Sequence, residues 1–128
     1  LEAEGTETHL LLREVQQFSH ELADAVARQV VLMHSQGILH GDLNLSNFLC
    51  RKTPSGYHFT MIDINRSHFT DGYPSDRQCL QNLVRLTHRR DLYEYLVRSY
   101  ARQRGWDEYS TAQQALQLLD LFENKRFR

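Results

Sequence analysis

The stretch His40-Gly41-Asp42-Leu43-Asn44-Leu45-Ser46-Asn47, followed after a short interval by Ile62-Asp63-Ile64-Asn65, decides the fold of this chain. The octet holds one carboxylate and two side-chain amides, and the second segment places an aspartate at the end of an apolar run. Asp and Asn also form ordinary turns readily, so a purely structural interpretation of Asp42, Asn44 and Asn47 stays open. Two such motifs in this order and at this separation are rarer than either alone, which favours a functional site.

The segment between the two motifs predicts a β-hairpin. Phe48-Leu49-Cys50 and Tyr57-His58-Phe59-Thr60-Met61-Ile62 are strand-like, and they flank a turn-rich segment at 52–56. The hairpin places Asn47 and Asp63 at neighbouring strand ends. Both polar side chains are therefore expected at the same end of the hairpin.

The two motifs together resemble those of the protein-kinase-like superfamily. The octet fits the pattern His-x-Asp-x-x-x-x-Asn of kinase catalytic loops, and Asp63 stands where the metal-binding Asp-Phe-Gly would sit. His-Gly-Asp in place of His-Arg-Asp points toward the small-molecule and atypical branches of the superfamily. The HGDLN-type loop and Asp63-Ile64-Asn65-Arg66 most resemble the lipopolysaccharide core kinases, which phosphorylate Kdo or heptose sugars, over roughly residues 9–104. Aminoglycoside phosphotransferases, RIO kinases and Bud32-type kinases share the HGDL core.

The resemblance implies an ATP-dependent phosphotransferase with assignable residue roles. Asp42 would be the base that orients the attacking hydroxyl, with His40 and Asn44 beside it in the catalytic loop and His40 serving to brace that loop. Asn47 and Asp63 would contact the nucleotide through Mg²⁺, which prefers a few oxygen ligands and takes the rest from water and phosphates. The implied acceptor is an anionic sugar or lipopolysaccharide. Transfer to a protein by an atypical RIO or Bud32-like kinase is the alternative, and a kinase-derived binding module without activity is a third.

Several departures from the protein-kinase pattern carry their own predictions. Asn65 occupies the position of the glycine in Asp-Phe-Gly, and Asn is the usual second choice for a left-handed backbone. The interval from Asp63 to the helix-capping signal at Ser75 is too short for a phosphorylation-controlled activation loop. Arg66 and His68 are expected to meet an anionic group of the substrate, since guanidinium binds carboxylates bidentately. A surface Arg66 in a turn is the competing interpretation.

The elements that complete a two-lobe kinase are missing from this sequence. There is no glycine-rich loop ahead of His40, and the two lysines, Lys52 and Lys125, both follow it. The residues before His40 read as helix and not as a five-stranded lobe. We therefore predict one domain over residues 1–128, mainly α with a small β-hairpin, which forms a kinase-like C-lobe without the N-terminal β lobe. We expect this domain to be a fragment of a longer two-lobe kinase and to be inactive by itself. Apolar surface that an N-lobe would cover favours self-association.

Apolar periodicity predicts the helices. The spacing from Leu11 to Met33 predicts one long helix that ends at Gly37, or two helices if Ser19 caps a new one. Ser75-x-x-Gln78 is a capping box that opens a helix toward Thr87. A stripe from Leu92 to Tyr100 ends at Gly105, Ser110-x-x-Gln113 precedes a last helix, and Trp106 is expected to pack between the two.

Composition limits the partners. A net charge of −1 and a pI near 6.7 argue against nucleic-acid binding. Six arginines lie between Arg85 and Arg104, which predicts a solvated helix face, or, less simply, attraction to anionic lipopolysaccharide or the inner-leaflet surface.

Cys50 and Cys79 are too few for a disulfide framework, and no apolar run could span a membrane. These features predict a cytoplasmic protein, with peripheral contact at the cytoplasmic face of the inner membrane as the more specific expectation.

Overall fold

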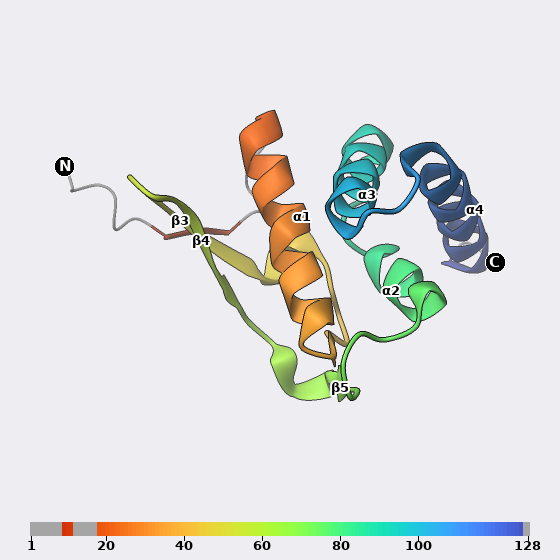
Figure 1. Cartoon of the computed structure of the whole chain (residues 1–128), viewed down its shortest axis with the longest axis horizontal. Helices are drawn as coiled ribbons and strands as arrows, with labels where there is room; N and C mark the ends of the chain where they lie inside the picture. The colour runs from red at the N-terminus through yellow and green to blue at the C-terminus, as the bar shows by residue number, and fades with distance from the viewer. Residues whose placement is uncertain (1–8, 12–17, 127–128) are drawn as a thin grey trace.

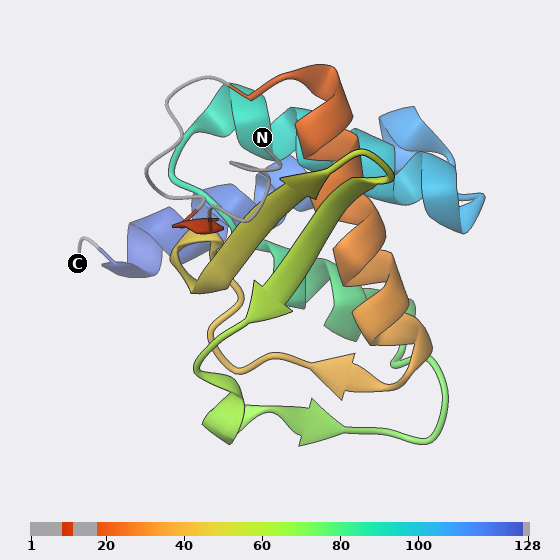
Figure 2. The same ribbon diagram turned by 90° about the vertical axis from the view of Figure 1, so that its left-hand side faces the viewer.

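The computed structural model describes residues 9–11 and 18–126, and helix α1 (His20–Ser35) lies at its centre. A small antiparallel sheet lies on one side of α1, and the helices that follow in the sequence lie on the other (Figure 1). Figure 2 shows the same arrangement from the side, with the sheet in front of α1 and the later helices behind it. The segment 40–47 follows α1 after a four-residue interval and leads directly into the sheet, so it connects the two halves of the fold.

The predicted hairpin is confirmed and is longer than predicted. β3 (Phe48–Thr53) pairs antiparallel with β4 (Gly56–Met61), with Phe48 opposite Met61 and Thr53 opposite Gly56. The turn therefore shrinks to Pro54 and Ser55. β1 (His9–Leu11) adds to the free edge of β3, which gives the sheet order β1-β3-β4.

The prediction that the residues before His40 are helical is wrong in part. Leu11 belongs to β1, and β2 (Ile38–Leu39) pairs with β5 (His68–Phe69) in a second, two-stranded sheet. Short strands of this kind are stabilised by their partners and leave no period of their own in the sequence. Val15, one of the apolar residues in the helical spacing from Leu11 to Met33, lies outside the described residues.

Helix α1 begins after Ser19, as in the alternative prediction that Ser19 caps a new helix. The Ser19 hydroxyl accepts a hydrogen bond from the Leu22 amide at 3.0 Å, so Ser19 is the N-cap. At the other end Gly37 adopts φ +77°, the left-handed conformation expected of the residue that follows a helix. A side chain there is excluded in any case, because a Cβ on Gly37 would lie 2.1 Å from the Thr70 carbonyl oxygen.

Three helices follow the sheet. The capping box at Ser75 and Gln78 is confirmed in α2 (Asp76–Leu83), which ends one turn short of Thr87. α3 (Arg90–Arg104) ends at Gly105 as predicted. α4 (Glu108–Arg126) begins before the predicted Ser110, because the Asp107 carboxylate accepts the Ser110 amide at 2.7 Å and caps the helix one turn earlier. Two 3-10 turns, η3 (Leu45–Asn47) and η4 (Ile64–Arg66), complete the chain.

The core forms where α3 packs between α1 and α4. Val26 and Val30 of α1 and Val97 and Tyr100 of α3 are all fully buried. The Tyr93 hydroxyl donates to the Ala115 carbonyl of α4 at 2.8 Å, which satisfies its polar end inside the core. Trp106 packs edge-on against Tyr100, with 5.5 Å between ring centroids, so its predicted packing role is confirmed.

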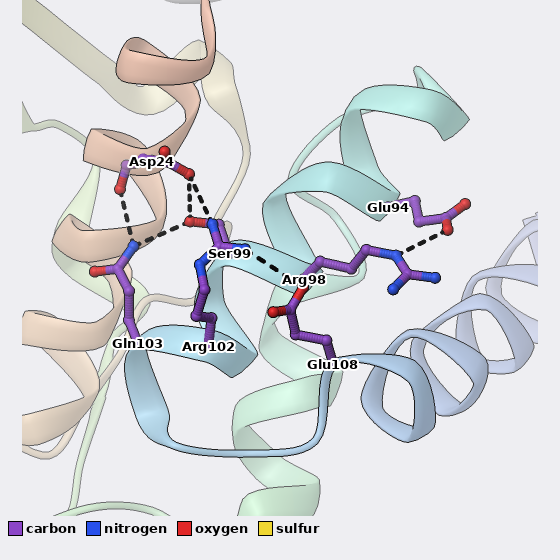
Figure 3. Close-up of polar contacts among 7 residues, drawn as sticks. All are labelled: Asp24, Glu94, Arg98, Ser99, Arg102, Gln103 and Glu108. Atoms are coloured by element: carbon purple, nitrogen blue, oxygen red, sulfur yellow. Dashed lines mark hydrogen bonds and ion pairs between the residues drawn. The ribbon is translucent and has the colours of Figure 1, made fainter.

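A polar seam aligns α1 with α3 (Figure 3). Asp24 Oδ1 accepts the buried Ser99 hydroxyl at 2.6 Å, and Arg102 Nη2 lies 3.4 Å from the same oxygen. Gln103 Nε2 donates to both the Asp24 carbonyl and Ser99 Oγ, each at 3.1 Å. Arg102 also reaches Glu108 of α4 at 3.4 Å. Part of the predicted basic face is therefore committed to holding helices together.

Within the residues that the structure describes, no helix is long and apolar enough to cross a membrane. Cys50 and Cys79 are free cysteines, and both are buried.

Candidate active site

His40 braces the catalytic loop from beneath. It is 1% exposed, its Nδ1 accepts the Asp42 amide at 2.9 Å, and its Nε2 lies 2.9 Å from the Ile62 carbonyl oxygen. A backbone amide can only donate, so Nδ1 is the acceptor and the ring proton sits on Nε2. Both ring nitrogens are thus used by backbone groups, and one imidazole joins the 40–42 segment to the end of β4.

Asn44 fixes the carboxylate of Asp42. Asn44 Oδ1 accepts the Ser46 amide at 2.9 Å and also contacts the Ser46 hydroxyl, which caps η3. The amide nitrogen is thereby turned toward Asp42 and donates to its Oδ1 at 2.9 Å. Asn44 therefore does both: its amide oxygen caps the η3 turn, and its amide nitrogen holds the Asp42 carboxylate.

Asn47 and Asp63 lie at the same end of the hairpin. The Ile62 amide donates to the Asn47 carbonyl at 3.0 Å, which extends the β3–β4 pairing by one step and sets Asp63 beside Asn47. Asn47 is buried, and its Nδ2 donates to the Asp42 carbonyl at 2.8 Å. That bond uses the amide nitrogen and leaves the amide oxygen as the group that a metal would bind.

The sequence suggested a left-handed backbone at Asn65, but the structure places it at Asp63. Asp63 has φ 62° and ψ 47°, whereas Asn65 lies inside η4. Asp63 is the one non-glycine residue with positive φ in the described part of the chain. Such a conformation costs about 1 kcal/mol or more and tends to mark functional positions. The sharp turn carries the chain from β4 straight into η4.

Gly41 explains why the motif reads His-Gly-Asp. A Cβ at Gly41 would lie 2.5 Å from the Arg66 carbonyl oxygen and 2.6 Å from the Arg66 Cβ. The η4 turn therefore packs directly on the catalytic loop, and only glycine leaves room for it. Arg66 itself is exposed, and together with His68 it lines a depression of about 400 Å³ that also includes His40 and Gly41.

The donor atoms fit a magnesium ion. Asn47 and Asp63 offer an amide oxygen and a carboxylate, a small all-oxygen set of the kind that Mg²⁺ accepts when phosphates and water complete its shell. No group of three or more His, Cys, Asp or Glu side chains could hold a metal in the described residues. The chemistry of this pair therefore suits a metal delivered with a nucleotide better than a permanent structural metal.

A buried chain of hydrogen bonds supports the loop from α3, and sequence reasoning missed it. Arg104 Nη1 donates to the Tyr100 hydroxyl at 2.5 Å, and that hydroxyl donates to His34 Nδ1 at 2.6 Å. His34 Nε2 then donates to Asn82 Oδ1, and Asn82 Nδ2 donates to the His40 carbonyl, both at 2.9 Å. The directions are fixed by the His40 carbonyl, which can only accept. Asn82 Nδ2 therefore donates to it, Asn82 Oδ1 accepts from His34 Nε2, and the Nδ1 of neutral His34 accepts from Tyr100.

The protonation state of His34 agrees with this chain. The pKa of His34 is lowered to about 4, chiefly by burial; the Asn82 hydrogen bond opposes this change, and the charge of Arg104 adds to it. Burial also raises the pKa of the Tyr100 hydroxyl. Asn82 gave no signal in the sequence beyond a polar residue inside a helix, and Arg104, counted there as part of a solvated face, has a side chain only 9% exposed.

Asp42 borders a cavity of about 690 Å³ that shares no lining residue with the depression of Arg66. Asn44 lines the same cavity, whereas Asn47, Asp63 and Arg66 do not. Arg85 lies at its wall, with Nη1 3.8 Å from Asp42 Oδ1. The sequence had counted Arg85 only as one member of a basic stretch.

Comparison with known proteins identifies the family. Residues 7–121 match the lipopolysaccharide kinase (Kdo/WaaP) family. The chain belongs to this family. A solved structure titled WaaP in complex with acyl carrier protein superimposes with a TM-score of 0.61 at 25% identity, over 83% of this chain and 47% of that one. The predicted kinase-like fold, mainly α with a small antiparallel sheet, is thereby confirmed.

Two subunits of the EKC/KEOPS complex are also similar to this chain. An EKC/KEOPS complex subunit BUD32 from Cryptococcus neoformans is 29% identical over 122 residues, which cover 88% of this chain and 42% of that protein. The subunit Tp53rkb of the same complex in Mus musculus is 37% identical over 57 residues, 44% of this chain and 23% of the relative. This chain of the Kdo/WaaP family thus spans less than half the length of these relatives.

Proposed function

We propose that this chain is the catalytic lobe of an ATP-dependent kinase that phosphorylates a sugar hydroxyl, of Kdo or heptose, in the inner core of lipopolysaccharide. Membership of the Kdo/WaaP family supports the sugar class. The observation that carries the catalytic assignment is the bracing of Asp42, whose carboxylate, amide and carbonyl are each held by a different side chain of the motif. The reaction would take place in the cytoplasm, at the cytoplasmic face of the inner membrane.

The residues have separate roles in this proposal. The oxygen of the acceptor hydroxyl bonds to the γ-phosphorus of ATP, and Asp42 accepts the proton of that hydroxyl. At the same time the bond from the γ-phosphorus to the bridging oxygen breaks and ADP leaves. Asn44 holds the carboxylate in place, and His40 holds the backbone beneath it. Magnesium at Asn47 and Asp63 would neutralise charge on the phosphate oxygens. Positioning and charge stabilisation supply most of the catalysis in such transfers, so a braced loop is what the reaction requires.

Replacing the proposed base tests the mechanism. Asp42→Ala in the full-length enzyme should lower transfer by about a hundredfold or more, the usual contribution of a positioned base, while nucleotide binding is spared. Asp71→Ala, which removes an exposed carboxylate from the loop before α2, should leave activity unchanged. Turnover retained in Asp42→Ala would contradict the assignment.

Nucleotide binding by this chain is a separate test. Calorimetric titration with ATP should show binding that requires Mg²⁺ and is about tenfold weaker in Asp63→Asn, which removes the charge but keeps a residue tolerant of left-handed backbone. Binding that is equally tight without Mg²⁺, or unaffected by the substitution, would remove Asp63 from the metal site.

A protein acceptor is the second candidate, and the similarity to BUD32 supports it. Purified full-length enzyme that labels itself or another protein, and leaves sugar acceptors unlabelled, would favour this alternative. A non-catalytic binding module is the third candidate. It predicts neither magnesium-dependent nucleotide binding nor transfer to any acceptor.

A further inference from the structure

The 690 Å³ cavity beside the catalytic loop has a definite position relative to Asp42. It lies between that loop, the segment 84–89 and helix α4. Asp42 borders it, whereas Asn47 and Asp63, the proposed metal ligands, do not. The proposed base therefore borders an open space that the proposed metal ligands do not line, so an acceptor hydroxyl could reach Asp42 from this cavity.

Two guanidinium groups line this space. Arg85 lies 3.8 Å from Asp42 Oδ1, too far for a hydrogen bond, and its Cζ is 5.5 Å from the centroid of the Phe122 ring. The Cζ of Arg89 is 6.0 Å from the centroid of Phe18. No hydrogen bond within the described residues uses either guanidinium. Both are therefore held near aromatic rings with their planar donors available to a carboxylate or phosphate.

The rest of the lining is mostly apolar. Leu86, Leu92 and Leu119 are buried at the base of the cavity, and the rings of Phe18 and Phe122 form part of its wall. His88 and Glu123 are the other charged or titratable members. An occupant must therefore combine an anionic group with a face of C–H groups, and hydroxyls would pair with Glu123. An acidic or phosphorylated sugar combines these features, whereas an inorganic anion does not.

We propose that this cavity is the acceptor site, and that its ligand is a sugar carrying a carboxylate or phosphate that binds Arg85 and Arg89. The proposal rests on the proposed function and locates the acceptor away from Arg66. On binding, the anionic group draws Arg85 from Asp42, which leaves the carboxylate to receive the proton of a sugar hydroxyl. That proton passes to Asp42 as the oxygen bonds to the γ-phosphorus and ADP departs.

Binding by this chain alone tests the site without any transfer. Chemical shifts in ¹⁵N-labelled protein would be followed during titration with glucose 6-phosphate, galacturonate, neutral glucose and inorganic phosphate. We expect saturable shifts at residues of the 84–89 segment with the two anionic sugars, and much weaker binding of glucose and phosphate. Arg85→Gln combined with Arg89→Gln should weaken the anionic sugars by about tenfold or more. Arg77→Gln, an exposed arginine of α2 outside the cavity, is the matched control and should bind normally.

The outcomes separate this proposal from the proposed function. Absence of anionic-sugar binding, equal binding of inorganic phosphate, or an unchanged affinity in the double variant would each overturn the acceptor site. Magnesium-dependent ATP binding with no sugar binding would leave the kinase assignment standing and this site disproved. Sugar binding without ATP binding would show an anionic-sugar site in this cavity and contradict the kinase assignment, and with it the role of the cavity as an acceptor site.

Discussion

His34 shows how a single buried side chain supports a catalytic loop that it does not touch. It joins Tyr100 of α3 to Asn82 of α2, and Asn82 holds the carbonyl of His40. Each neutral hydrogen bond of this kind contributes only about 1 kcal/mol to stability, but leaving one partner unsatisfied in the core costs more. This series of hydrogen bonds therefore acts chiefly by fixing these side chains and the His40 carbonyl in one arrangement.

His34 makes the stability of the fold depend on pH. Its pKa is about 4 in the folded protein and near 6.5 in the unfolded chain, so between these values the unfolded state binds more protons. Stability from this residue is fully present above pH 6.5 and declines as the pH falls toward 4. We expect wild type to lose about 2 kcal/mol more than His34→Gln between pH 7 and pH 5. Urea unfolding at the two pH values measures the difference.

A control separates His34 from the other histidines. His58→Gln removes an exposed histidine of β4 and should follow the wild-type pH dependence. Equal pH dependence in wild type and His34→Gln would mean that His34 is protonated without cost, which contradicts the buried neutral chain.

Helix ends show which of two capping signals the backbone uses. Ser75 and Gln78 satisfy each other in a full capping box. Ser110 and Gln113 have the same spacing, but Asp107 caps α4 instead, and Ser110 Oγ accepts a hydrogen bond from the Gln114 side chain at 3.3 Å. A carboxylate at a helix N-terminus also interacts favourably with the helix dipole.

The two candidate N-caps of α4, Asp107 and Ser110, can be compared by substitution. We expect Asp107→Ala to lower the free energy of unfolding by about 1 kcal/mol, the usual cost of losing an N-cap. Ser110→Ala should change it by less than about 0.5 kcal/mol, as for an exposed surface position. Thermal or urea unfolding checks both. A larger loss in Ser110→Ala than in Asp107→Ala would show that α4 begins at the later residue in solution.

The whole molecule places apolar side chains on the surface next to the proposed metal site. Four large ones lie between residues 62 and 73: Ile62, Ile64, Phe69 and Tyr73, with Phe69 73% exposed. An exposed apolar patch of this kind favours association between copies.

Self-association is therefore expected of this chain. Sedimentation velocity over a wide range of concentration should show a dimer or larger species, and Ile64→Ser combined with Phe69→Ser should reduce it. Leu121→Ser, at a residue of α4 that is 60% exposed and distant in sequence, is the control and should have no effect. A monomer at all concentrations would exclude the open patch as an interface.

The sequence alone determined the kinase motifs, the hairpin between them and the helix signals at Ser19, Ser75 and Gly105, because each depends on residues close together in the chain. Tertiary structure decided the rest. Only the packing of η4 on the loop explains Gly41, and only the turn out of β4 makes Asp63 left-handed in place of Asn65. The support from Arg104 through His34 to Asn82 joins residues from three helices, and the cavity of Arg85 forms where α4 meets the loop. Contacts between distant segments leave no local pattern, so only the folded chain reveals them.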